Sequence, residues 1–169
     1  MERKTIEAMI LALHGPDVNA VRGLQQFIGQ GRWAAEALVI KQQALVAEWF
    51  GDPAGVAIVD GSGFPKRGPD SVGVAPQYCG HVGKIANCQQ GVFLIYATPH
   101  AYTFLDERLY LSECWFGEEY RERWRDCAIP EDIHFQTEPE LGLAMIRELA
   151  KRGVVPFRWV TAIWISDNS

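Results

Sequence analysis

The chain has 169 residues, of which 48% are apolar and 22% are charged, and these are ordinary values for a globular domain. They exclude long disorder, a collagen repeat and a coiled coil, and no run of about 18 apolar residues predicts a membrane span. The net charge of −5 comes from residues 101–169, because residues 1–100 hold eight acids and eight bases. This balance argues against strong nonspecific nucleic-acid binding but allows a local basic site in the first hundred residues. The apolar run 8–13 is too short for a signal peptide, so we expect a cytoplasmic protein.

The first fifty residues predict three helices. An apolar stretch over 6–13 predicts the first, and Asp17 is the predicted N-cap of the second, which ends near residues 29–31. The pattern over 33–50 predicts a third and longer helix, which the Gly-Asp-Pro sequence directly after it ends.

Strand patterns follow the helices. Residues 55–60 form a nearly continuous apolar run that predicts a buried central strand ending in the carboxylate of Asp60. The segment 61–83 is rich in glycine and proline, which predicts loop or turn for much of its length. Residues 90–98 and 102–111 then predict two strands joined as an antiparallel hairpin.

The last third of the chain predicts a charged helix over 115–126, a helix capped by Thr137 and closed by Gly153, and a strand over 154–162. The whole order predicts an α/β protein. N-terminal helices precede an incomplete RNase H-like mixed sheet of three antiparallel strands, a crossover helix and a fourth, parallel strand.

Asp60 is the strongest candidate for a functional residue. An Asp at the end of a buried strand, followed by glycines, suits a metal-binding carboxylate, because the strand fixes the oxygen and the glycines let a substrate backbone approach. From these residues alone, an Asp that merely caps the strand remains the alternative. The glycine spacing matches neither a P-loop nor an EF-hand loop.

Basic and other polar side chains follow Asp60. Lys66, Arg67 and Lys84 could neutralise DNA phosphates near it, or they could be ordinary surface charge. Core or hydrogen-bonding roles are expected for Tyr78, His81, Asn87 and Gln89, and surface or capping roles for Asp106, Glu107, Asp132 and His134. The four cysteines show no paired metal-ligand spacing. They predict buried or half-buried thiols, although Cys79, His81 and Cys88 could be considered as zinc ligands.

The segment from Val59 to Gly68 resembles the DDE transposases of bacterial insertion sequences, and so do further blocks in the same order. These blocks are Ser71–Ala75, Gln77–Gly80, Gly83–Ile85, Asn87–Gln89, Gly91–Leu94, Leu109–Leu111, Thr137–Pro139 and Phe157–Ala162, with Glu2–Glu7 upstream. The resemblance covers about residues 1–162. It implies that Asp60 is the first catalytic and metal-binding carboxylate, that DNA transposon ends are the partner, and that three acids bind two Mg²⁺ or Mn²⁺ ions for attack on a phosphodiester.

The sequence departs from the family's pattern after the last predicted strand. The family places its second Asp directly after Thr-Ala, whereas Ile163 follows Thr161-Ala162 here. Gly61 stands where members often carry another acid, and Asp167 is too late to replace the second Asp. We therefore expect a truncated, catalytically incomplete transposase. Its expected parts are a helical region 1–52, the first part of the catalytic domain 53–162, and an aberrant tail 163–169.

Two other functions are compatible with the sequence. The chain could be a non-catalytic DNA-end-binding or regulatory fragment, nucleoid-associated when bound to DNA, in which the basic side chains contact phosphates. As a regulatory fragment it could also associate with a full-length transposase. It could instead be an interaction module without a nucleic-acid role, because truncation would expose Trp and Phe faces that pair two copies of the chain.

Overall fold

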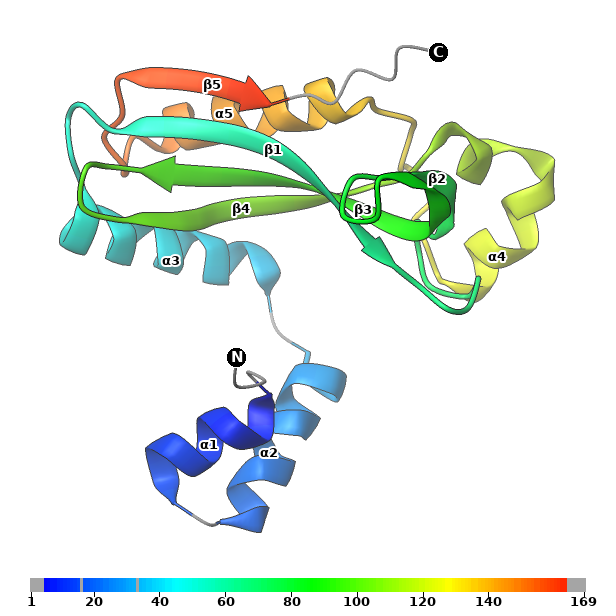
Figure 1. Cartoon of the computed structure of the whole chain (residues 1–169), viewed down its shortest axis with the longest axis horizontal. Coiled ribbons are helices and arrows are strands. Elements are labelled where there is room, and N and C mark those ends of the chain that lie inside the picture. The colour runs from blue at the N-terminus through cyan, green and yellow to red at the C-terminus, as the bar shows by residue number, and fades with distance from the viewer. Residues whose placement is uncertain (1–4, 16, 33, 164–169) are drawn as a thin grey trace. The chain divides into compact units, whose positions relative to one another are not determined.

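The computed structural model describes residues 5–15, 17–32 and 34–163, which form two compact units divided between Ala37 and Leu38 (Figure 1). The first unit contains helices α1 (Ile6–His14) and α2 (Val18–Gln30), which pack against each other. Asp17 caps α2 as predicted, since its carboxylate accepts hydrogen bonds from the backbone N–H groups of Asn19 and Ala20. In the described part of the chain, no helix is both long and apolar enough to span a bilayer.

The second unit is built on a mixed sheet of five strands. Its elements are α3 (Ala35–Phe50), β1 (Val56–Pro65), β2 (Ala75–Cys79), β3 (Lys84–Ala97), β4 (Tyr102–Tyr110), the 3₁₀ turns η1 (Glu113–Phe116) and η2 (Glu118–Tyr120), α4 (Arg121–Asp126), α5 (Glu138–Arg152) and β5 (Trp159–Ile163). The strand order is β2-β3-β1-β5, and β4 also pairs with β3. Strands β1, β2 and β4 run antiparallel to β3, whereas β5 lies parallel beside β1. The predicted RNase H-like α/β arrangement is therefore confirmed.

Several strand boundaries differ from the prediction. Strand β1 does not end at Asp60 but continues to Pro65, and β2 lies inside the segment 61–83 that was expected to be largely loop. Both differences have one cause, because β3 begins at Lys84 and is long enough to pair with both segments. Strand β5 begins only at Trp159, after a segment that contains a proline, and proline is disfavoured inside a paired strand.

One face of the sheet packs on α5 to form the core. Val59 and Leu94 from the sheet and Met145 and Leu149 from α5 are fully buried in one cluster. Burying each such side chain stabilises the fold by roughly 1.5–3 kcal/mol. Tyr96 is also buried there. Its hydroxyl accepts a hydrogen bond from the backbone N–H of Asp52 at 2.8 Å and donates one to the carbonyl of Pro156 at 2.8 Å.

Helix α3 is bonded to the backbone of β4. The side-chain amides of Gln42 and Gln43 donate to the consecutive carbonyls of Phe104 and Leu105, at 2.7 Å and 3.2 Å. These carbonyls lie at the register shift of the β3–β4 pair, where Leu105 is the extra residue. Gln43 is only 1% exposed, so this contact belongs to the packed interior. It also places most of α3 with the sheet, whereas the sequence grouped it with the helical region 1–52.

Helix α5 begins and ends where the sequence predicts. The Thr137 hydroxyl accepts from the backbone N–H of Glu140, whose carboxylate accepts in return from the Thr137 backbone. The backbone N–H and the hydroxyl of Thr137 both donate to the Glu140 carboxylate, and these two hydrogen bonds lower the pKa of Glu140. Gly153 ends the helix in the left-handed conformation, at φ 62°. Ile163, expected to open an aberrant tail, is the last residue of β5, and residues 164–169, with Asp167, lie outside the described residues.

Candidate functional site

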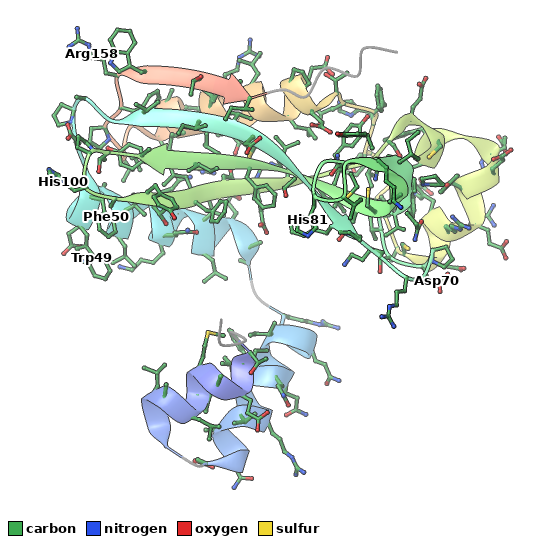
Figure 2. All side chains as sticks on the ribbon, in the orientation of Figure 1. Trp49, Phe50, Asp70, His81, His100 and Arg158 are labelled. Atoms are coloured by element: carbon green, nitrogen blue, oxygen red, sulfur yellow. The ribbon has the colours of Figure 1, made fainter. Side chains whose placement is uncertain are left out.

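A polar cavity of about 590 Å³ lies beside the middle of β1. Its lining residues are Asp60, Gly61, Ser62, Gly63, Gln77, Tyr78, Gly80, His81, Gln90, Tyr110, Ser112, Glu138 and Ile163. They come from β1, the β2–β3 hairpin, the end of β4, the start of α5 and the end of β5. Figure 2 shows His81 at that hairpin and Arg158 at the opposite end of the sheet. The polar side chains that line this cavity come from segments that are far apart in the sequence.

Asp60 lies between two strands, at the last position of β1 whose partner in β5 is among the described residues. It pairs with Phe93 of β3 on one side and with Ile163 of β5 on the other. The side chain is half-buried, so the surrounding strands limit its freedom while it remains accessible. The residue beside Asp60 in β5 thus directly follows the Thr161-Ala162 pair.

Two glycines make room for polar side chains against β1. A Cβ atom on Gly61 would lie 2.8 Å from Oε2 of Glu138, and one on Gly63 would lie 2.6 Å from Oε1 of Gln90. Contacts under 3.0 Å would force a neighbour to move, so any other residue at these positions would displace those oxygens. Glycine in this part of the strand marks a close approach of side chains from other elements.

Glu138 and Tyr110 affect each other electrostatically. The pKa of Tyr110 is raised above its ordinary value, first by burial and then by the negative charge of Glu138. Both residues line the cavity. The negative charge of Glu138, in the first turn of α5, therefore also contributes to the electrostatic environment of the cavity.

Gln90 brings an unpaired acceptor to the same cavity. Its amide nitrogen donates to the carbonyl of Tyr78 at 3.1 Å, which fixes the orientation of the amide. Its Oε1 is buried and has no hydrogen-bond partner. An unsatisfied buried oxygen in a polar cavity is a position where a water or a bound ion supplies the missing contact.

The predicted phosphate-binding residues do not line this cavity. Lys66, Arg67 and Lys84 are all exposed. Lys66 lies six residues beyond Asp60, roughly 20 Å further along the strand direction, and lines a separate cavity with Phe64, Phe93 and Arg108. Lys84 starts β3, opposite Cys79. None of these three basic residues is among the residues that line the Asp60 cavity.

Among the other polar residues, the amides hold loops in place. Asn87 donates to the carbonyls of Lys66 and Gly68, and Gln89 donates to the carbonyl of Val72 at 2.6 Å. These bonds agree with the hydrogen-bonding roles expected for them. The expectation that Asp106 is a surface acid is wrong. The residue is only 5% exposed, and its carboxylate accepts a hydrogen bond from the Arg108 guanidinium.

The cysteines are free thiols. Cys79 and Cys88 are buried and Cys127 is half-buried as expected, whereas the expectation is wrong for Cys114, which is exposed. Burial and the neighbouring Cys79 raise the pKa of Cys88 to about 11. His81 is exposed. In the described ranges, no group of three or more His, Cys, Asp or Glu side chains is arranged to hold a metal ion.

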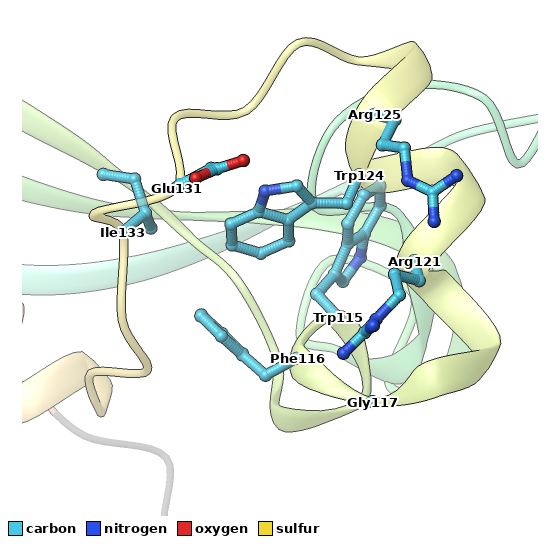
Figure 3. A pocket seen from close by; sticks show the side chains of 8 residues that line it. All are labelled: Trp115, Phe116, Gly117, Arg121, Trp124, Arg125, Glu131 and Ile133. Carbon is cyan, nitrogen blue, oxygen red and sulfur yellow. The ribbon is translucent and has the colours of Figure 1, made fainter.

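A second cavity of about 360 Å³ lies between residues 115–125, part of the segment predicted as a charged helix, and the loop before α5 (Figure 3). Trp115, which donates to the carbonyl of Val74 at 3.3 Å, forms part of its wall, and Phe116 and Trp124 meet edge-to-face at 5.3 Å. Arg121 and Arg125 also line it. None of the four predicted site residues contributes to its lining, so it is separate from the Asp60 cavity.

Glu138 is the site residue that sequence reasoning missed. The pattern Thr137-Glu138-Pro139-Glu140 identifies a helix start, and acids are expected in any first helical turn. Because a helix start is enough to explain an acid at this position, the sequence gives no reason to expect that Glu138 also lines the cavity. The signal that could have found it is the glycine after Asp60, because a residue without a side chain beside a candidate carboxylate leaves space for another group.

Comparisons with known proteins give one finding. Residues 1–162 match the family model described as DDE superfamily endonuclease. No curated protein and no solved structure matches the chain. Since the family model covers nearly the whole chain and Asp60 lies within its sheet, the chain belongs to the DDE superfamily endonucleases.

Proposed function

We propose that this chain is the part of an insertion-sequence transposase that contributes Asp60, the first catalytic carboxylate, and that it acts on transposon ends. The observation that carries this proposal is the parallel register of β1 and β5. It sets Asp60 beside Ile163, the residue directly after Thr161-Ala162. In DDE transposases that position holds the second Asp, so the same strand pair would bring two catalytic acids together.

The family generally uses divalent metals, which when bound activate a water or a DNA 3′ hydroxyl for attack on a phosphodiester. The donor chemistry of the cavity fits such an ion, because Mg²⁺ is usually held by one or two carboxylates and completed by waters and substrate phosphates. Asp60 would hold it. Lys66, Arg67 and Lys84 would contact the DNA backbone outside the cavity and set the position of the duplex.

Ile163 makes this chain catalytically incomplete in our proposal. It supplies an apolar side chain, 56% exposed, where a carboxylate is needed. We expect no nicking of supercoiled plasmid DNA in Mg²⁺ or Mn²⁺. Nicking that is lost in Asp60→Ala would contradict this part of the proposal, because it would show that the remaining acids are present.

The register itself is tested by Ile163→Asp. Isothermal titration with Mn²⁺ should show binding tighter than that of the unmodified chain by roughly tenfold or more, since affinity rises with the number of charged ligands. Asp60→Asn in the same background should remove the gain. The matched control is Val160→Asp, in the same strand and 50% exposed, which pairs with Ala57 instead. An equal gain in that control would reject the proposed site.

A second function, binding of transposon ends without cleavage, is supported by the exposed side chains of Lys66, Arg67 and Lys84. It would depend on the exposed basic residues. Fluorescence anisotropy should then show preference for terminal-repeat DNA over scrambled DNA, with affinity falling between about 50 and about 200 mM salt. Lys66→Ala and Arg67→Ala should lower the affinity and the salt slope. Equal, weak binding to both DNAs would reject this function.

A further inference from the structure

Glu138 projects from the first turn of α5 into the space beside β1. Its Oε2 lies where the Cβ of residue 61 would otherwise be, at 2.8 Å from that position. Gly61 directly follows Asp60 in the strand. The missing side chain therefore lets a carboxylate from a distant helix approach the backbone next to Asp60.

The cavity that Glu138 enters is the one that Asp60 lines. Both residues border the same volume of about 590 Å³, together with the hydroxyl-bearing residues Tyr110 and Ser112. Both carboxylate residues are half-buried, which limits competition from bulk water without closing the site. Hard divalent cations bind to oxygen ligands of these types.

One further observation supports a cation in this space. The buried Oε1 of Gln90, which has no hydrogen-bond partner, faces Gly63 in the same lining. A metal-bound water would satisfy that oxygen.

We propose that Glu138 is the second protein ligand of a single divalent cation held beside Asp60, in a chain whose β5 position is occupied by Ile163. This inference rests on the proposed function for the role of Asp60. It differs from that function in using an acid that comes before β5 rather than after it. The remaining coordination positions would be filled by waters and, in a complex, by DNA phosphate oxygens.

The test is Mn²⁺ binding by the full chain, measured by isothermal titration and by loss of the free-ion EPR signal. The structure predicts one site, and Glu138→Gln should weaken it by roughly tenfold or more, as Asp60→Asn does. The matched control is Glu140→Gln, which removes an exposed charge from the same helical turn and retains an acceptor for the Thr137 cap. Its affinity should remain within about twofold of the unmodified chain.

A second variant tests the geometry without changing a ligand. Gly61→Ala would press against Oε2 of Glu138 and should weaken Mn²⁺ binding several-fold. Gly68→Ala is its control, because a Cβ there meets no atom within 4 Å. Thermal unfolding of each variant shows whether the chain remains folded, so a loss of binding with an unchanged melting temperature reports on the site.

The outcomes separate this inference from the proposed function. Unchanged affinity in Glu138→Gln, with a loss in Asp60→Asn, would overturn the inference and leave the role of Asp60 intact. The inference would also be overturned, and the role of Asp60 kept, if the unmodified chain did not bind Mn²⁺ but the Ile163→Asp variant did. Loss in Glu138→Gln without loss in Asp60→Asn would contradict the paired site and the proposed function together.

Discussion

The two halves of β1 differ in what surrounds them. The closed half, Val56–Val59, pairs with β3 on one side and β5 on the other, and Ala57 and Val59 are fully buried against α5. The open half, Asp60–Pro65, keeps its pairing with β3, and within the described residues only Asp60 of this half is paired with β5. One strand thus changes from a structural core to the wall of a cavity within a single residue. The buried residues that stabilise the fold therefore lie directly before the residues that line the candidate site, and they hold this part of the strand in place.

The largest effect should come from the core of the closed half. Leu94 pairs with Val59 and is fully buried, so Leu94→Ala should lower the free energy of unfolding by about 2–5 kcal/mol. The matched control is Leu109→Ala, near the open half, where the side chain is 40% exposed and a smaller loss is expected. Urea unfolding followed by circular dichroism measures both. Equal losses would mean that the two halves do not differ in packing.

A smaller effect should follow from a methyl group added at the start of the closed half. A Cβ on Gly55 would lie 2.4 Å from the hydroxyl of Tyr96, which is buried and bonded to Asp52 and Pro156. Gly55→Ala should therefore cost about 1–3 kcal/mol in unfolding free energy. The same change at Gly68, in open space beyond β1, should stay within about 0.5 kcal/mol. A tolerated Gly55→Ala would show that Tyr96 is free to move.

The smallest effect concerns the cap of α5, the helix that supports the closed half and carries Glu138 to the open half. Thr137→Ala should cost about 1 kcal/mol in unfolding free energy at neutral pH, and Thr137→Ser much less. Hydrogen bonds from Thr137 lower the pKa of Glu140, so their contribution is present above the unfolded pKa of that carboxyl and is lost as pH falls through the lowered value. Unfolding measured at neutral and at acidic pH should show the difference between Thr137→Ala and the unmodified chain shrinking toward acid. A difference that grows toward acid would contradict this explanation of the cap.

Local signals predicted the parts of the fold that depend on neighbouring residues. Asp17, Thr137 and Gly153 mark helix ends because their side chains or conformations act within one turn. The order of helices, hairpin and parallel strand also followed from sequence, since each element has its own apolar period. These features need no knowledge of distant partners.

Features that depend on distant partners were not predictable in this way. The continuation of β1 beyond Asp60 and the presence of β2 depend on pairing with β3, and their glycines and prolines suggested loop instead. Asp106 is buried beside Arg108, whose guanidinium also pairs with Glu148 of α5, and this long-range contact is not evident from the spacing of charges. In the candidate site, Asp60 was identified from its strand and its glycines. Glu138 was not, because only the folded chain brings α5 onto Gly61.

The glutamine pair of α3 has a consequence for self-association. The outer edge of a sheet presents unpaired carbonyl and N–H groups that can recruit another strand and begin aggregation. Gln42 and Gln43 donate to two consecutive carbonyls of β4, so both carbonyls already have a partner. The N–H groups of an added strand would have to compete with these two amides at that point of β4. The two glutamines therefore make this part of β4 a poorer template for another strand.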